Sequence, residues 1–128
     1  METSIRFIVL FIFLIISNYL FADPIRGHSV VIQILDKISA RIYTKEIIVG
    51  KRIKYASLEI EIFDCKKRPP EEIPEDFVLL RIKDEVSPNN FERVFQGWMI
   101  SSSPAVTPFE HPTYDIWVKD CKIDTDSK

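Results

Sequence analysis

The chain has 128 residues, with 17 Lys and Arg against 19 Asp and Glu and a net charge of −2. Charges of both signs are interspersed, and the longest basic run is Lys66-Lys67-Arg68, so the sequence excludes the extended basic surface of a nucleic-acid-binding protein. The length allows one hydrophobic core and is too short for two.

The amino terminus predicts a secretory signal peptide over residues 1–22. An unbroken apolar run, residues 7–16, follows Arg6, and Ala22 offers a cleavage site ahead of Asp23-Pro24. The run is shorter than the roughly 20 residues that a membrane-spanning helix needs. We therefore expect a periplasmic protein, with secretion or an uncleaved anchor in the inner membrane as the alternatives.

The chain has two cysteines, Cys65 and Cys121. An exported chain meets an oxidising compartment, where such a pair usually forms a disulfide. The loop-entropy estimate for closing the intervening stretch of chain is about 4 kcal/mol. We therefore expect one disulfide that supplies a large share of the stability of a small domain.

Strand signals begin soon after the predicted cleavage point. Residues 30–35 and 38–43 are two strand-like runs, the second with clear alternation, and Asp36-Lys37 between them indicates a hairpin. Gly50-Lys51 indicates a turn. Residues 58–65 alternate most clearly, which predicts a strand with one buried and one exposed face.

The second half continues in the same way. Residues 66–76 carry prolines and many charges, which predicts an irregular surface loop. Residues 77–82 predict a strand, and the break at residues 87–90 indicates a second hairpin. Residues 91–99 fit both periods, and we expect a strand there with a bulge at Gly97.

Serines and prolines between residues 101 and 113 predict a long irregular connection, whose length hints at function. Residues 114–121 predict the last strand, and residues 122–128 a charged, frayed tail. The sum is six to eight short strands. We expect an all-β fold, a single small antiparallel β-sandwich or barrel, formed by an exported domain over residues 23–121.

Strand alternation also predicts where the disulfide lies. Cys65 shares its parity with Phe63 and with acidic residues, and Cys121 shares its parity with Trp117 and with charged residues. Both sulfurs should then lie on the outer face of one sheet, beside Phe63 and Trp117. One bulged residue in either strand would reverse this expectation.

Catalytic patterns are weak. Ser101, Ser102, Ser103, His111 and Asp115 supply the side-chain types of a hydrolytic triad, but without a G-x-S-x-G motif. The neighbouring acidic residues add no recognisable metal-ligand spacing. We expect no catalytic residues, metal or cofactor. A small periplasmic hydrolase that uses the region from Ser101 to Asp115 is the alternative.

The aromatic residues of the last third are better candidates for a binding surface. Trp98, Phe109, Tyr114 and Trp117 lie near the irregular connection, together with His111. Such side chains stack on sugar rings or anchor a protein partner. We expect contact with an envelope protein or a cell-wall component, although core packing explains the same residues more simply.

Four segments carry a resemblance: LDKISARI from Leu35, KRPPEEIPE from Lys67, FQGWMISSSPA from Phe95 and EHPTYDIWVKDC from Glu110. In this order they resemble a family of small exported Gram-negative proteins, domain-of-unknown-function family 2155. The resemblance covers nearly all of the chain after residue 22. It implies export and a cysteine pair, and it implies no activity, cofactor or catalytic residue.

Overall fold

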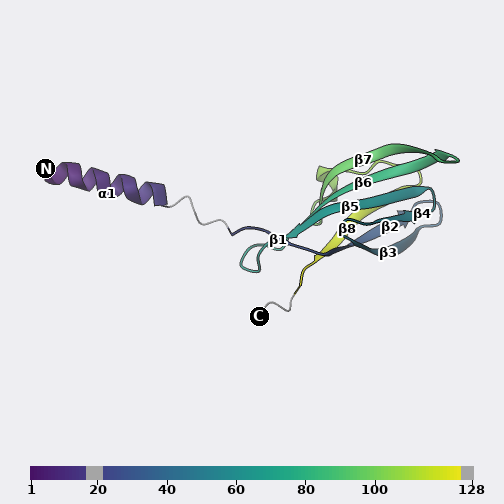
Figure 1. Ribbon diagram of the computed structural model, residues 1–128, viewed down its shortest axis with the longest axis horizontal. Coiled ribbons are helices and arrows are strands. Elements are labelled where there is room, and N and C mark those ends of the chain that lie inside the picture. The colour runs from purple at the N-terminus through teal and green to yellow at the C-terminus, as the bar shows by residue number, and fades with distance from the viewer. Residues whose placement is uncertain (17–21, 125–128) are drawn as a thin grey trace.

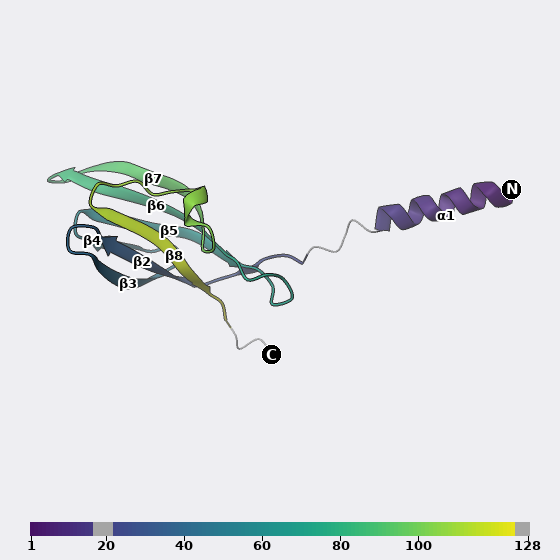
Figure 2. The same ribbon diagram turned by 180° about the vertical axis from the view of Figure 1, so that it is seen from behind.

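The computed structural model describes residues 1–16 and 22–124. This part of the chain holds one α-helix, eight strands and one short 3-10 helix. The strands form two antiparallel sheets (Figure 1, Figure 2). The fold is therefore mostly β, as the alternation of apolar and polar residues predicts.

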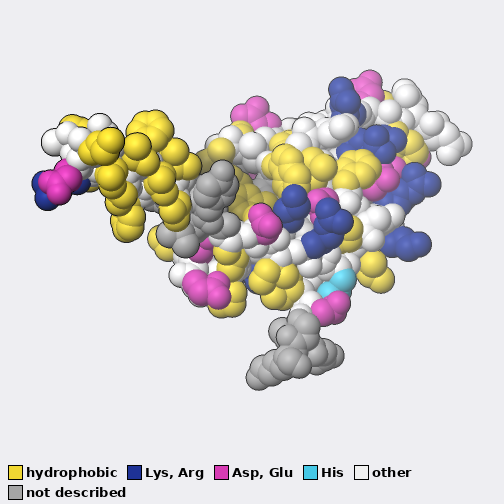
Figure 3. All heavy atoms as spheres, turned by 60° about the vertical axis from the view of Figure 1, so that its left-hand side comes forward, with side chains coloured by type: hydrophobic (Ala, Val, Ile, Leu, Met, Phe, Trp, Pro, Cys, Tyr) yellow, Lys and Arg dark blue, Asp and Glu magenta, His cyan; other side chains and the backbone are white. Residues whose placement is uncertain are grey.

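Helix α1 (Glu2–Ile16) differs from the strands, because it is apolar from Phe7 to its end and buries none of its residues. Figure 3 shows its visible side covered with hydrophobic side chains. Within the described residues, no helix is long and apolar enough to cross a membrane. Residues 17–21 of the predicted signal peptide and residues 125–128 of the predicted tail lie outside the described residues.

The five-stranded sheet has the order β1-β5-β6-β7, with β4 also paired to β5, and the three-stranded sheet has the order β3-β2-β8. The strand bounds are β1 (Ile25–Arg26), β2 (Ser29–Asp36), β3 (Arg41–Ile48), β4 (Arg52–Tyr55), β5 (Leu58–Lys67), β6 (Asp76–Ser87), β7 (Asn90–Ile100) and β8 (Tyr114–Lys122). The 3-10 helix η1 (Pro104–Val106) lies in the connection from β7 to β8. Strands β1 and β4 are too short to give a sequence signal.

Both sheets contribute to a single core. Alternate side chains of β2, β5, β6 and β8 are buried, because successive side chains of a pleated strand point to opposite faces and one face of each strand is apolar. The fully buried aliphatic side chains include Ile32, Ile34, Leu58, Ile60, Ile62, Leu80 and Ile82. This shared core holds the two sheets face to face.

The predicted hairpin β2–β3 is confirmed, with its second strand starting later than expected. Asp36 Oδ1 accepts hydrogen bonds from the backbone N–H groups of Ile38 at 2.9 Å and Ser39 at 3.2 Å. Ala40 then has a φ of 56°. This turn uses residues 37–40, so that Ile38 is exposed and pairing begins at Arg41.

The second predicted hairpin, β6–β7, is also confirmed, and its strand β7 has a bulge, but not at Gly97. Gly97 pairs regularly with Leu80, whereas the register shifts where Ile82 faces Phe95 and the next residue faces Arg93. The extra residue is Val94. This position lets Val94 and Phe95 both pack against the core, which explains why the bulge lies here.

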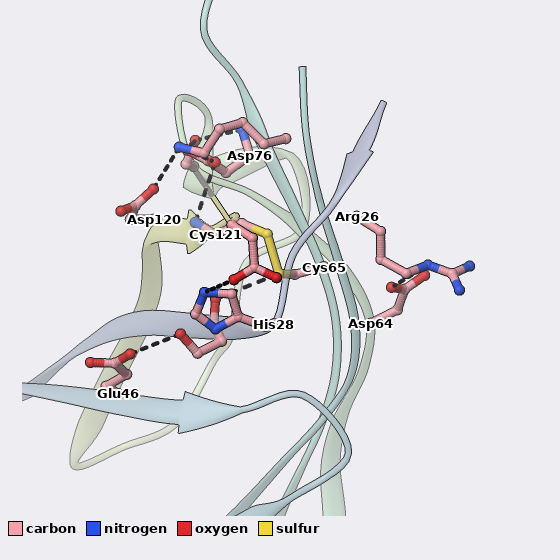
Figure 4. Close-up of a disulfide and its surroundings, with 12 residues drawn as sticks. Arg26, His28, Glu46, Asp64, Cys65, Asp76, Asp120 and Cys121 are labelled. Carbon is pink, nitrogen blue, oxygen red and sulfur yellow. Dashed lines mark hydrogen bonds and ion pairs between the residues drawn. A yellow bond between two sulfur atoms is a disulfide. The ribbon is translucent and has the colours of Figure 1, made fainter. Parts of the chain in front are cut away.

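The predicted disulfide is present, joining Cys65 and Cys121 across 56 positions of sequence (Figure 4). Cys65 is on β5 and Cys121 is on β8, which belong to different sheets, and both residues are fully buried. The expected location on the outer face of one sheet is therefore wrong. The bridge crosses the core and ties the sheets together.

Two bulges explain the difference. In β5, Ile62 pairs with Leu80 while Asp64 pairs with Leu79, which leaves Phe63 as an extra residue. In β8, the register with β2 shifts between Val118 and Asp120, which leaves Lys119 as an extra residue. Each extra residue reverses the alternation after it and turns the following cysteine inward.

Candidate binding surface

The structure divides the five residues of the predicted binding surface among three places. Phe109, His111 and Tyr114 lie together at one end of the sheets. Trp98 lies on β7 in the five-stranded sheet, and Trp117 lies on β8 in the three-stranded sheet. The five residues thus form no single surface, and a binding role for each of them stays a prediction.

The first group belongs to a chain of stacked and tilted rings. The ring centroids of Phe109 and His111 lie 5.8 Å apart, and those of His111 and Tyr114 lie 5.4 Å apart. Tyr114 meets Tyr55 edge-on at 5.9 Å, and Tyr55 meets Tyr43 at 5.4 Å. Because Tyr114 and Tyr43 come from the three-stranded sheet and Tyr55 from the other, this aromatic end joins the two sheets.

His111 is buried in this chain of rings and uses both ring nitrogens. Nδ1 accepts the backbone N–H groups of Thr113 at 3.1 Å and Tyr114 at 3.2 Å, and Nε2 lies 2.9 Å from Asp84 Oδ2. With Nδ1 accepting, the proton of the neutral ring is on Nε2 and points at Asp84. His111 in this position has no free nitrogen to take a proton from a serine.

Asp84, on β6, is the hydrogen-bond partner of His111 Nε2. Burial raises the pKa of Asp84, but the neighbouring Ser57 hydroxyl and the His111 ring lower it further, so that its pKa lies below the ordinary value. The carboxylate is therefore ionised near neutral pH. It accepts a hydrogen bond from His111 Nε2 and so holds the histidine ring in place.

The serines of the hydrolase alternative belong to a different cluster. Ser101 Oγ lies 2.9 Å from Glu75 Oε1, and the Ser102 backbone N–H donates to the same oxygen at 3.0 Å. Ser102 Oγ donates to Glu75 Oε2. Burial raises the pKa of Glu75, but these hydrogen bonds lower it more. They hold the start of the β7–β8 connection and do not form a triad with His111.

In the described part of the chain, no three His, Cys, Asp or Glu side chains are grouped so that they could hold a metal ion. The candidate acidic residue beside His111 has another partner. Asp115 lies 3.1 Å from Lys37 Nζ, and this same ammonium group donates to the His111 carbonyl at 2.8 Å. These contacts hold the connection against the β2–β3 turn.

The strongest candidate surface is the outer face of the five-stranded sheet. Leu79 on β6 pairs with Trp98 on β7, and both point away from the core because Val78 and Leu80 point into it. Phe77 lies one row below, and the bulged Phe63 lies beside this row. Trp98 is 40% exposed and Phe63 is 39% exposed.

A basic side chain lies over each aromatic ring of this face. Lys66 Nζ lies 5.8 Å from the Trp98 centroid, Arg68 Cζ lies 5.6 Å from the Phe77 centroid, and Arg81 Cζ lies 5.1 Å from the Phe63 centroid. We call this set the cation–aromatic face; it comprises Phe63, Lys66, Arg68, Phe77, Leu79, Arg81 and Trp98. Figure 3 shows basic side chains among hydrophobic ones on the visible side of the β domain.

The charges of this face are only partly balanced. Arg81 Nη2 lies 2.6 Å from Glu61 Oε2, and Arg68 Nε lies 4.0 Å from Glu72 Oε2. Lys66 forms no ion pair with any residue that the structure describes. Exposed aromatic and arginine side chains in one patch are typical of protein interfaces.

Trp117 on the other sheet lies in a different environment. Its Nε1 donates to Gln33 Oε1 at 2.9 Å, and its ring is half-buried on the outer face of β8. No basic side chain of the described residues lies over it. The indole N–H is therefore already satisfied within the protein.

Sequence reasoning places Trp98 in a candidate surface but misses Phe77 and Arg81 and gives Phe63 a different role. Phe63 is on the outer face, as the alternation predicts, but the disulfide that it should cover there is in the core. Strand alternation could have indicated Phe77, because it directly precedes Val78, whose side chain points into the core. The pairing of Lys66 with Phe77 and of Leu79 with Trp98 depends on a register that alternation does not give.

Two comparisons with known proteins agree with each other. The family model described as "Uncharacterized protein conserved in bacteria (DUF2155)" matches residues 30–121, a range that begins in β2 and ends in β8. The chain is also similar to "Uncharacterized protein RP359" of Rickettsia prowazekii (strain Madrid E), with 31% identity over 87 residues.

That similarity covers 68% of this chain and 56% of the Rickettsia protein, so the chain spans little more than half of that relative's length. No solved structure matches the chain. The family match extends from the first core strand to the second cysteine of the disulfide. The chain therefore belongs to the DUF2155 family of bacterial proteins.

Proposed function

We propose that this protein is exported to the periplasm and that its β domain is a non-catalytic binding module, which contacts another envelope protein through the cation–aromatic face. The observation that carries the proposal is the pair of exposed rings, Trp98 and Phe63, within one patch of apolar and basic side chains. Large aromatic and arginine side chains supply most of the binding energy in protein interfaces.

Two features support export. Helix α1 is apolar and follows the pattern of a signal peptide, with Arg6 ahead of its apolar run. The Cys65–Cys121 bridge is of a kind that forms and persists in oxidising compartments. Cleavage after Ala22 would release the β domain into the periplasm, and an uncleaved helix would keep it at the inner membrane.

A protein partner fits this face better than a cell-wall sugar. A sugar ring stacks on an open aromatic face, whereas the rings of Trp98, Phe77 and Phe63 each have a basic side chain above them. A protein partner with acidic and apolar side chains can pair with those cations and contact the ring edges at once. Lys66, which has no ion pair among the described residues, is the cation most available for such a contact.

The test places a photoreactive amino acid at Gln96, which is exposed on the same face as Trp98, in cells that express the full chain. The matched control carries the probe at Thr44, which is exposed on β3 of the other sheet. We expect a discrete crosslinked protein from Gln96 and not from Thr44, and its loss in a Phe63→Ala/Trp98→Ala background.

Equal crosslinking from both positions, or a product that survives the double substitution, would contradict the protein-binding proposal. Co-sedimentation of the purified domain with isolated peptidoglycan, abolished by the same double substitution, would assign the face to the cell wall instead. Export has its own readout, the amino-terminal residue of the exported protein by mass spectrometry. We expect Asp23, and Met1 in a membrane fraction would indicate the uncleaved anchor.

A further inference from the structure

The segment between β1 and β2 crosses the disulfide. Ile25 and Arg26 pair with Lys67 and Lys66 of β5. The Gly27 N–H then donates to the Cys65 carbonyl at 2.9 Å. We call residues 25–28 the amino-terminal strap, because they pass beside the bridge on their way into β2 (Figure 4).

The strap contacts both strands that carry the cysteines. On the β5 side it uses the Gly27 bond to Cys65, and on the β8 side the His28 N–H donates to the Lys122 carbonyl at 2.9 Å. Both cysteines are fully buried. The strap therefore spans the seam between the two sheets at the position of the bridge.

Gly27 fits against the sulfurs because it has no side chain. An ideal Cβ at this position would lie 2.3 Å from Cys121 Sγ, 2.6 Å from Cys65 Sγ and 2.7 Å from the Lys122 carbonyl oxygen. Real Cβ atoms do not approach other atoms this closely, and two of these three neighbours are fixed by the disulfide itself. The backbone of Gly27 is thus packed directly on the bridge.

We propose that the amino-terminal strap is a gate over the Cys65–Cys121 disulfide, so that external thiols reach the bridge only when the strap has undocked. In thiol–disulfide exchange an external thiolate forms a bond to one sulfur while the S–S bond breaks and the other cysteine leaves as a thiolate. A second external thiolate then completes the reduction and is itself oxidised to a disulfide. The first attack requires access to a sulfur, which the docked strap denies.

The strap can open without unfolding the domain. Its strand β1 has two residues, and its ion pair between Arg26 and Asp64 is long, at 3.8 Å, with the Arg26 side chain 77% exposed. Undocking breaks the short β1–β5 pairing and the backbone hydrogen bonds of Gly27 and His28, and short segments with exposed side chains open locally at a fraction of the global unfolding free energy. The strap can therefore undock and expose the disulfide while the rest of the domain stays folded.

The strap begins three residues after Ala22, the predicted cleavage point. If the protein is exported as proposed above, the strap stays undocked while it is near the membrane, and the two cysteines can then be oxidised to the disulfide. Docking of the strap afterwards covers the disulfide. This order of events rests on the proposed export. The gate itself rests only on the packing of Gly27 and on the burial of the two sulfurs.

The experiment measures the rate at which dithiothreitol reduces the bridge in the full chain, held in a mild detergent, over a series of urea concentrations below the unfolding transition. The test variants are Gly27→Ala, which places a Cβ against the sulfurs, and Arg26→Pro, which disrupts β1 without adding an atom beside them. Ile116→Ala, buried on β8 away from the bridge, serves as the control for lost global stability.

We expect both strap variants to be reduced at least about tenfold faster than the unmodified protein at low urea, with little dependence on urea, because opening is local. Ile116→Ala should be reduced faster only near its unfolding transition. If neither strap variant is reduced faster than Ile116→Ala at matched stability, the bridge opens only by global unfolding and the gate is refuted. Arg26→Pro decides the outcome if Gly27→Ala does not fold.

Discussion

Strand β8 joins the two sheets at both of its ends, and the two ends use different chemistry. At one end Cys121 forms a covalent bond to β5, with Asp76 and Lys67 beside it. At the other end Tyr114 joins a chain of aromatic rings that contains His111. We call these the disulfide end and the aromatic end.

The two ends tolerate different conditions. The disulfide end keeps its sheets connected at any pH, and only a reductant can separate them covalently. The aromatic end depends on ring packing and on the contact between His111 Nε2 and the Asp84 carboxylate, which weakens when acid protonates Asp84. We therefore expect a reductant to act only at the disulfide end, whereas acid also weakens the aromatic end.

The largest effect should come from removing the bridge. The double substitution Cys65→Ala/Cys121→Ala frees the chain between these residues in the unfolded state, and we expect it to lower the free energy of unfolding by about 4 kcal/mol in urea titrations. The unmodified protein unfolded under reducing conditions serves as the control. A loss below about 1 kcal/mol would mean that the disulfide end does not limit the stability of the domain.

At the aromatic end, His111→Ala should cost about 2 kcal/mol, since it removes two ring contacts and leaves the Thr113 and Tyr114 N–H groups without their acceptor. The matched control is His28→Ala, a half-exposed residue whose ring faces Asp124 at 3.4 Å. Chemical denaturation of both variants checks the difference. Equal stabilities would show that the ring chain does not hold the sheets together.

Acid should weaken the domain through two carboxylates: Glu75, which is buried near the disulfide end, and Asp84, which is half-buried at the aromatic end. The folded-state pKa values of Glu75 and Asp84 lie below their ordinary values of 4.5 and 3.8. Each carboxylate therefore stabilises the fold above its ordinary pKa, and this contribution is lost as the pH falls through the lower folded-state pKa. We expect the free energy of unfolding to decrease as the pH is lowered below about 4.5.

Glu75→Gln and Asp84→Asn should each flatten this acid dependence, and Glu71→Gln, on an exposed loop residue, should leave it unchanged. Urea titrations between neutral pH and about pH 3 measure the slopes. If the dependence of the unfolding free energy on pH is unchanged in Glu75→Gln or Asp84→Asn, the substituted residue does not contribute to the loss of stability in acid.

The smallest effect on stability should come from the outer face. Trp98→Ala removes a ring that is 40% exposed together with its contact to Lys66, and we expect a loss below about 1 kcal/mol. Thermal unfolding of this variant measures it. A larger loss would mean that Trp98 contributes to the structure in the way the buried rings of the aromatic end do.

Much of the fold follows from local sequence. The hairpins β2–β3 and β6–β7, the strand β5 and the cysteine pair come from period-two alternation, turn residues and the export context. The location of the disulfide does not, because the bulges at Phe63 and Lys119 have no glycine or other local signal. One unpredicted residue in each strand reverses the face of a cysteine.

The cation–aromatic face is also hard to predict from the sequence, for a similar reason. The sequence marks Trp98 as an aromatic residue near an irregular connection, but its neighbours Phe63 and Lys66 come from β5, more than 30 positions earlier in the chain. Only the strand register brings them together. Residue type alone singles out His111, while its two backbone donors depend on the turn that follows it.

The cation–aromatic face, and not the opposite sheet, is the surface that we propose for binding. The most direct test compares Trp98→Ala with Trp117→Ala, each combined with the photoreactive probe at Gln96, by the yield of crosslinked partner in cells. We expect Trp98→Ala to remove the crosslinked product and Trp117→Ala to leave it unchanged. Full retention of the product in Trp98→Ala, with its loss in Trp117→Ala, would contradict this account.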